Sequence, residues 1–304
     1  MINYELKPGR IDLFPGKEYE GRTLSEFLEY FHTSRKNRYL MVLNKQVLLN
    51  RKPAASENET LKAGDTVTVL LPSEPVDYVP AEEECRVVYE DDFVYIAHKD
   101  AGLIVHGPQG DTGCLAAQAA AYQINHGIEA PVRFIHRLDE ETSGLVLFVK
   151  IPFFQPWYDA ALEARDIHRN YLAITAGRAH PGQKFTYNQK IGKDRHVNGK
   201  YRFSETGKEA VTIAEVVDKK KDYELIRCQL ETGRTHQIRV HLSGNRHPIV
   251  NDPLYGVASH DFKGMGLWAY ELVFPNPLTD EIITVHDVMN PDYAMFPMVR
   301  KLLK

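Results

Sequence analysis

A proline- and acid-rich stretch, SEPVDYVPAEEE from Ser73 to Glu84, divides the sequence into two unequal parts. It holds two prolines and five acidic residues and shows no hydrophobic periodicity, which is typical of an interdomain linker. A chain of 304 residues is long enough for two domains. We therefore expect a small domain over residues 1–72, a linker over residues 73–84 and a larger domain over residues 85–304.

The composition is that of a water-soluble globular protein, with 43% hydrophobic and 26% charged residues. No apolar run approaches the roughly 20 residues that a membrane helix needs, and the N-terminus lacks a signal-peptide pattern. The three cysteines, Cys85, Cys114 and Cys228, lie far apart and are odd in number. This pattern favours reduced thiols in the cytoplasm over a disulfide framework. We expect a cytoplasmic protein that has no membrane partner and acts as a monomer.

Local charge differs from the average charge. The net charge of −4 and a pI of about 6.4 argue against a nucleic-acid-binding protein. Residues 33–53, however, carry six Lys or Arg residues and no acid, and residues 184–208 carry seven against two acids. Such clusters are able to face phosphates, although ordinary solvated surface charge explains any one of them equally well.

The small domain begins with two expected helices. Leu24, Phe27, Leu28 and Phe31 have the spacing of a buried helical face, and the basic stretch after Thr33 predicts a second helix with Tyr39, Leu40 and Leu43 facing inward. The segments VLLNRKP and LKAGDTVTV follow as strand and turn signals. Together these motifs resemble the RNA-binding domain of ribosomal small-subunit protein S-four, although a generic small α/β domain remains the alternative. In that family the second helix lies on RNA, which implies RNA contacts for Arg35, Lys36, Arg38 and Lys45.

The larger part is dominated by strands that recur as hairpins. Residues 210–217 and 223–230 flank the turn DKKKD, and residues 267–274 and 282–285 form the last strands. An alanine-rich helix is expected over residues 113–126. This pattern predicts an α+β fold, with a mixed, largely antiparallel sheet and flanking helices.

The segment HRLDEETSGLVLFVK places a polar motif at the start of a buried strand. Asp139 follows a His-Arg pair and precedes Thr-Ser-Gly, a position where a rigid element can present a reactive carboxylate. A turn aspartate that caps backbone amides is the more common use of such a residue. The segment alone favours that structural role.

A second polar motif, GRTHQIRVH, follows the strand that ends at Leu230. Arg234 at the strand exit has the fixed charge that could keep Asp139 ionised. A zinc site made of His236, His241, His247 and Asp252 fits poorly, because the two nearest histidines lie five residues apart and would not share a face. A serine hydrolase is also disfavoured, since Ser143 lies outside a GxSxG motif.

Both motifs, in this order and continued by HLSGNRHPIVNDPLYG, resemble the signature pair of the RluA-type pseudouridine synthases. The resemblance covers the chain from about residue 87 to residue 277 and implies the pseudouridine synthase fold, RNA as the partner, and chemistry that needs no metal or other cofactor. Those enzymes detach a uracil base from C1′ and rejoin it through C5. An N-terminal domain of the S-four type is common among them.

The resemblance also assigns roles to individual residues. It implies that Asp139 is the nucleophile, that Arg234 is its charge partner and that Tyr171, in HRNYLAI, stacks on the target base. Ile238 would pack against this tyrosine, and Arg137 would fill the space left when the uridine leaves its stack. His136 is expected to have a structural or RNA-contact role. Without the resemblance, Tyr171 reads as a core aromatic residue.

Two departures and one insertion modify this picture. The usual NKPAG turn is HKDAG here, with Asp100 in place of proline, and Arg169 replaces the lysine that precedes the tyrosine in the family pattern. Neither change touches the expected chemistry. The basic insertion over residues 187–208 interleaves aromatics with cations, including Lys193 and Arg195, and we expect it to contact RNA. A disordered surface loop is the alternative.

We therefore expect a pseudouridine synthase that acts on large-subunit ribosomal RNA or, second, on transfer RNA. A catalytically idle RNA-binding assembly factor on the same fold is the competing class. The intact set of Asp139, Tyr171 and Arg234 argues against that class. A glycosidase-like hydrolase would need a second paired acid, for which Glu140 and Glu141 have no clear role.

Overall fold

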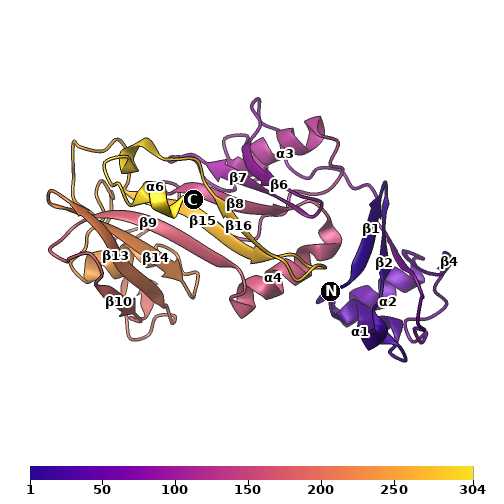
Figure 1. The fold of residues 1–304 in the computed structure, drawn as a ribbon. Coiled ribbons are helices and arrows are strands. Elements are labelled where there is room, and N and C mark those ends of the chain that lie inside the picture. The colour runs from indigo at the N-terminus through magenta and orange to yellow at the C-terminus, as the bar shows by residue number, and fades with distance from the viewer. Residues whose placement is uncertain (304) are drawn as a thin grey trace.

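A computed structural model describes residues 1–303 and contains two sheets of very different size (Figure 1). The N-terminal sheet has five strands in the order β1-β2-β5-β3-β4. Its strands are β1 (Asn3–Lys7), β2 (Arg10–Phe14), β3 (Val47–Leu49), β4 (Lys52–Pro53) and β5 (Val67–Leu70). None of the helices within residues 1–303 combines the length and apolarity needed to cross a bilayer.

Two α-helices complete the N-terminal part, which also contains the 3₁₀ turn η1 (Lys17–Tyr19). α1 (Leu24–Glu29) begins at a capping box, in which Thr23 and Glu26 each accept a hydrogen bond from the other's backbone N–H. The expected apolar face of this helix is confirmed, because its four predicted residues are fully buried.

The inward face predicted for α2 (Arg35–Leu43) is wrong. Tyr39 and Leu43 are 55% and 59% exposed, and the helix buries Arg38 and Val42 instead. The prediction had placed the large apolar residues of the helix on its buried face. The structure instead turns inward an arginine whose guanidinium finds acceptors inside the domain.

The large sheet has nine strands and forms the body of the molecule (Figure 1). Its order is β10-β13-β14-β9-β15-β8-β7-β6, with β16 also paired to β15. Within residues 1–303 its strand pairs are antiparallel except for β8 with β15, which confirms the mixed, largely antiparallel sheet. The strands are β6 (Arg86–Glu90), β7 (Val94–Lys99), β8 (Ser143–Val149), β9 (His168–Ala176), β10 (Lys184–Tyr187), β13 (Thr212–Lys220), β14 (Tyr223–Leu230), β15 (Leu267–Pro275) and β16 (Ile282–His286).

Short helices and one hairpin flank this sheet. The hairpin pairs β11 (Ile191–Lys193) with β12 (Tyr201–Phe203), so that part of the basic insertion is ordered. The helical elements are α3 (Leu115–Asn125), η2 (Pro152–Phe154), α4 (Gln155–Ala164), α5 (Gln237–Gly244), η3 (Pro291–Tyr293) and α6 (Val299–Leu302). Figure 1 shows α4 between the large sheet and the N-terminal domain.

The central strand β8 explains the glycine of the TSG motif. All seven residues of β8 are buried, and β15 crosses next to its first residues. Gly144 has φ +120°, and a Cβ at this position would lie 2.2 Å from the carbonyl oxygen of Ala269. Only glycine permits this approach. The strand that follows Asp139 is therefore held against β15 at its first residues.

The segment over residues 73–84 is hydrogen-bonded along the larger domain. Glu74 N donates to Glu129 O at 2.9 Å, and Ala81 N donates to Ala117 O at 3.0 Å. The carboxylate of Asp77 accepts from Val132 N and from the guanidinium of Arg133, both at 2.8 Å. The proline-rich composition therefore specifies an extended, docked connection.

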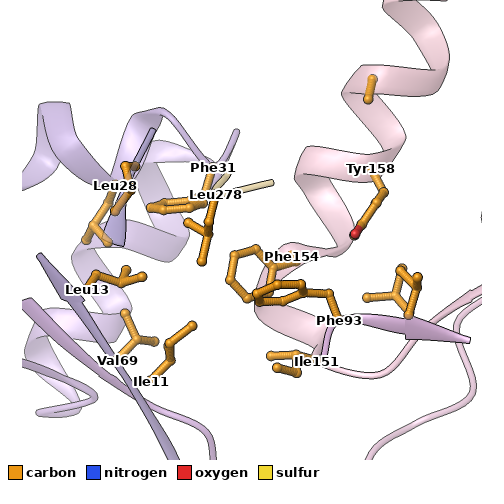
Figure 2. Close-up of a cluster of buried hydrophobic side chains, with 14 of the residues drawn as sticks. Ile11, Leu13, Leu28, Phe31, Val69, Phe93, Ile151, Phe154, Tyr158 and Leu278 are labelled. Carbon is orange, nitrogen blue, oxygen red and sulfur yellow. The ribbon is translucent and has the colours of Figure 1, made fainter. Parts of the chain in front are cut away.

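The two parts of the chain share one hydrophobic core (Figure 2). Phe31 of the N-terminal domain packs its ring against Phe153 at 5.0 Å and Phe154 at 5.7 Å between centroids. Ile2 N also donates to Leu278 O at 2.7 Å. Since buried aromatic pairs of this kind stabilise a protein by about 0.5–1.5 kcal/mol beyond their area, the domains are held together by packing.

Candidate active site

Asp139 lies in the extended segment that leads into β8, at the edge of a cleft of about 1270 Å³. Its backbone carbonyl accepts from Thr142 N at 3.1 Å, which closes the turn before the strand. The side chain is 24% exposed and lines the cleft. The motif therefore has both features considered for it, a turn and a carboxylate that is open to a ligand.

Lys99 fixes the turn that follows Asp139. Its buried ammonium donates to three backbone carbonyls, those of Asp100 at 2.9 Å, Leu103 at 2.5 Å and Glu140 at 2.8 Å. Burial lowers the pKa of Lys99 to about 8, against the opposing effect of nearby carboxylates, Asp139 first. The HKDAG turn is thus docked directly against the segment that carries Asp139, with Asp100 in place of the family's proline.

Arg239 in the first turn of α5 is the cation that contacts Asp139. Its guanidinium holds Asp252 through two hydrogen bonds of 2.8 Å and donates from Nη1 to Asp139 Oδ2 at 3.2 Å. The side chain of Arg239 is 4% exposed. Burial alone would lower the pKa of Arg239, but hydrogen bonding and the charges of Asp252 and Asp139 raise it. A bidentate anchor on one carboxylate thus aims a fixed positive charge at the other.

The prediction that Arg234 is this charge partner is wrong. Arg234 lies before α5, its side chain is exposed, and its Nε donates to the carbonyl of Glu209 at 2.8 Å. It lines the cleft but makes no ion pair with Asp139 within residues 1–303. Both arginines belong to one short motif, and only the later one falls on the helix face that points to Asp139. The pairing of Arg239 with Asp252 could not be predicted from any sequence pattern, and Asp252 had been considered only as a zinc ligand.

Tyr171 and Ile238 both line the cleft. Tyr171, on β9, is buried and lines the cleft, and Ile238 belongs to the same hydrophobic cluster. Burial raises the pKa of Tyr171 to about 12, and the charge of Asp139 adds to this while that of Arg169 opposes it. The phenol is therefore neutral near pH 7, and its ring is available to a ligand as an apolar surface.

His136 and Arg137, which precede Asp139, face different environments. His136 is buried, and burial, with a smaller effect of the Arg169 charge, lowers its pKa to about 3. Its ring nitrogens have no hydrogen-bond partner within residues 1–303. Arg137 is exposed and contacts Nε2 of His106 at 2.9 Å through Nη1. His136 thus supports the segment from inside as a neutral ring, while Arg137 lies at the cleft surface.

A hydrogen-bonded pair that sequence reasoning missed lies opposite Asp139. His236 has the left-handed backbone conformation, with φ 56°, and its Nδ1 lies 2.9 Å from Tyr255 Oη. Its Nε2 lies 4.0 Å from Asp139 Oδ2. Tyr255 also accepts a hydrogen bond of 2.7 Å from Tyr201 N and lies beneath the guanidinium of Arg239, 5.1 Å from its ring centroid. The hairpin of the insertion is thereby attached to the site.

The predicted RNA-contact residues separate into three groups. Lys193 lines the cleft, and Arg195 is exposed in the turn of the same hairpin. Arg35, Lys36 and Lys45 are exposed on and after α2. The role expected for Arg38 is wrong, since its guanidinium is buried and donates to Ser25 Oγ at 3.0 Å and Thr33 O at 2.5 Å.

The four residues considered as zinc ligands have protein partners instead. His241 lies between Thr212 and the carbonyl of Gln189, His247 pairs with Glu224 at 2.7 Å, and Asp252 pairs with Arg239. Within residues 1–303, no three His, Cys, Asp or Glu side chains gather in an arrangement that could hold a metal ion.

Comparison with known proteins identifies the class that this fold and site define. Residues 93–244, half of the chain, match the RNA pseudouridylate synthase family, and residues 16–67 match the RluD ribosomal pseudouridine synthase N-terminal domain. An uncharacterized RNA pseudouridine synthase of Bacillus subtilis, YhcT, is 38% identical over 79% of this chain and 80% of its own. The chain therefore belongs to the RNA pseudouridylate synthase family and is an RNA pseudouridine synthase.

A second relative and a solved structure extend this comparison. The Xanthomonas campestris protein named ribosomal large subunit pseudouridine synthase D is 32% identical over 90% of this chain and 85% of its own. The human RNA pseudouridylate synthase domain containing 4 is 23% identical, with a TM-score of 0.56 over 69% of this chain and 90% of that one. The human structure supports the fold, which confirms the pseudouridine synthase architecture expected from the sequence.

Proposed function

We propose that this enzyme isomerises specific uridines in large-subunit ribosomal RNA and uses Asp139 as its nucleophile. The observation that carries the proposal is the contact between Asp139 and Arg239 at the edge of a cleft that is large enough for a nucleotide. The relatives named for the large ribosomal subunit, which resemble this chain over most of its length, support the choice of RNA. In this proposal the protein acts in the cytoplasm as a monomer.

The proposed reaction needs one carboxylate and no external reactant. The Asp139 carboxylate attacks C1′ while the C1′–N1 bond breaks, and the uracil leaves with the bonding electrons. The base turns within the cleft, C5 then bonds to C1′ and displaces Asp139, the proton on C5 is released to solvent, and N1 takes up a proton from solvent. Atoms and electrons balance, and the product is an isomer of the substrate.

The other site residues have supporting roles in this proposal. Arg239, anchored on Asp252, orients the Asp139 carboxylate and places a fixed positive charge beside it, which is electrostatic preorganisation of the kind that gives enzymes much of their rate. Tyr171 presents its neutral ring to the base, and Ile238 belongs to the same buried hydrophobic cluster. Arg137, exposed beside the nucleophile, would occupy the gap left by the flipped uridine.

Tritium release from RNA labelled at C5 of uridine tests the reaction directly. Wild-type protein should release tritium from large-subunit ribosomal RNA transcripts, and Asp139→Asn should release none above background. Mapping pseudouridines in ribosomal and transfer RNA from a deletion strain would then assign the target. If the missing sites lie in transfer RNA alone, the ribosomal assignment is wrong while the chemistry stands. If wild-type protein releases no tritium from any cellular RNA, the protein is a binding factor.

A further inference from the structure

A second, smaller pocket lies between α2 and the segment that begins α4, outside the catalytic cleft. It has a volume of about 330 Å³. Leu40 and Met41 of α2 form one wall, and Pro152, Phe153 and Pro156 form the other. We call this pocket the interdomain slot, because its two walls come from the two domains. Its size suits one nucleobase and is too small for a folded element of a partner protein.

Thr33, which lines the interdomain slot, carries a buried polar group. Thr33 is only 5% exposed, yet its hydroxyl has no hydrogen-bond partner within residues 1–303. A buried polar group in that state costs about 1–3 kcal/mol unless a ligand or water satisfies it. Arg38 holds the residue in place through its 2.5 Å hydrogen bond to Thr33 O. The side chains of Asn37, Asn44 and Gln46 add amide donors and acceptors to the same lining.

The chemistry of the lining matches an RNA base. Phe153 is half-buried and contacts Phe31 at an interplanar angle of 50°, and both Phe153 and Met41 form part of the slot lining. Single-stranded RNA is bound by stacking bases on aromatic rings and by hydrogen bonds from amide and hydroxyl groups to base edges. The exposed cations Arg35, Lys36 and Lys45, on and next to α2, supply the charge that the flanking phosphates require.

The position of the interdomain slot ties it to the catalytic cleft through one helix. Pro156, at the start of α4, lines the slot, whereas Asp159, Leu162 and Glu163, later in α4, line the cleft. At a rise of about 1.5 Å per residue, these cleft residues lie about 4.5 to 10.5 Å from Pro156 along the helix axis. Because the shared core fixes both domains, this separation is set by the fold and does not depend on a flexible connection.

We propose that the interdomain slot binds one unpaired base of the substrate RNA, a few nucleotides away from the uridine in the cleft. This proposal rests on the proposed function, since it assigns a specificity contact to the same RNA. The enzyme would then accept a uridine only when a second unpaired base lies at the distance set by α4.

Two substitutions in the interdomain slot and one outside it test the proposal. Phe153→Leu keeps an apolar side chain in the domain contact and removes the flat ring, and Thr33→Val removes only the hydroxyl. Leu43→Ala is the matched control, because Leu43 is exposed on the same helix and does not line the slot. Each variant is assayed by tritium release from a large-subunit ribosomal RNA transcript and by thermal unfolding.

We expect Phe153→Leu to lower kcat/KM about fivefold or more, with kcat at saturating RNA within about twofold of wild type. Thr33→Val should act in the same direction, and Leu43→Ala should match wild type. A transcript that contains 4-thiouridine should crosslink to the peptides carrying Met41 or Phe153. Unchanged kcat/KM in both slot variants, or crosslinks confined to other peptides, would overturn the proposal. The crosslink stays informative even if wild-type protein releases no tritium, an outcome that would refute the proposed function alone.

Discussion

The catalytic cleft and the outer face of α2 both carry arginine and lysine, but the two regions hold these charges in opposite ways. In the cleft, Arg239 is buried and bonded to two carboxylates, and behind the Asp139 segment Lys99 is buried and bonded to three carbonyls. On α2, Arg35 and Lys36 are exposed and have no ion-pair partner within residues 1–303.

We relate this difference to two proposed functions, catalysis for the buried charges at the cleft and RNA binding for the exposed charges on α2. A charge that acts on a reacting atom must already be in place, so its desolvation and orientation are settled on folding. A charge that binds phosphate gains from staying hydrated and unpaired, since the phosphate then releases its counterions on contact.

The largest effect is expected at Asp139, the proposed nucleophile. Asp139→Asn removes the attacking carboxylate and should lower pseudouridine formation at least about a thousandfold. Because the carboxamide keeps the size of the side chain, RNA affinity should change less than about threefold. Single-turnover tritium release and filter binding measure the two quantities. A variant that retains a tenth of wild-type activity would remove Asp139 from its proposed role.

The two arginines of the GRTHQIR motif provide a matched pair. Arg239→Gln leaves Asp252 buried without its cation and should destabilise the protein by about 3–5 kcal/mol, with at least about a hundredfold loss of kcat. Arg234→Gln removes an exposed side chain bonded to one carbonyl and should leave kcat within about fivefold. Urea unfolding and saturation kinetics distinguish the two. Equal losses of kcat would contradict the pairing described for the cleft.

The exposed cations on α2 should affect RNA binding and its salt dependence without affecting catalysis. Arg35→Ala and Lys36→Ala should each reduce the slope of log affinity against log salt by about one and leave kcat at saturating RNA unchanged. Arg38→Ala serves as the internal contrast, because its buried guanidinium should cost stability without changing the salt slope. Binding titrations between about 50 and 200 mM salt provide the measurement, since a slope change of one alters the affinity ratio across this range about fourfold. Identical salt slopes for all three variants would contradict the difference proposed between the exposed cations and the buried Arg38.

A smaller effect concerns the neutral histidine behind the nucleophile. The pKa of His136 is about 3 in the folded protein, because of burial, against about 6.5 when unfolded. Between these values the unfolded chain binds a proton that the folded protein does not, so the free energy of unfolding falls as pH falls. The contribution is about 1.4 kcal/mol per pH unit. His136→Phe should reduce proton uptake on unfolding by about one between pH 4 and pH 6. Calorimetry in two buffers measures this uptake, and an unchanged value would mean that His136 is not kept neutral.

The sequence predicted the type of fold well and the pairing of charges poorly. Alternating strands, the TSG motif before a buried strand and the helical spacing of residues 24–31 are local patterns, and the structure confirms the elements that they predict. The ion pair of Asp139 with Arg239 joins residues that are 100 positions apart and depends on which face of α5 turns to the cleft. Nothing in the order of the two arginines determines that face.

The burial of Arg38 went unpredicted for a related reason. A basic residue in a basic helix is expected to face solvent, and only the tertiary structure supplies the acceptors on Ser25 and Thr33 that allow it to turn inward. Tyr39 and Leu43 then take the outer face. The contact of His236 with Tyr255 was missed because the two residues lie in separate parts of the motif, and no regular sequence spacing predicts that they meet.

The core that joins the two parts of the chain has a consequence for how this protein can be divided. A fragment that starts after residue 84 would leave Phe93, Phe154 and Leu278 facing water, since these residues pack in the cluster that Ile11, Leu13 and Phe31 complete. Such a fragment would expose an apolar patch that favours aggregation. The N-terminal domain is thus also a structural cover for the larger domain, so a change on one side of their contact requires a matching change on the other.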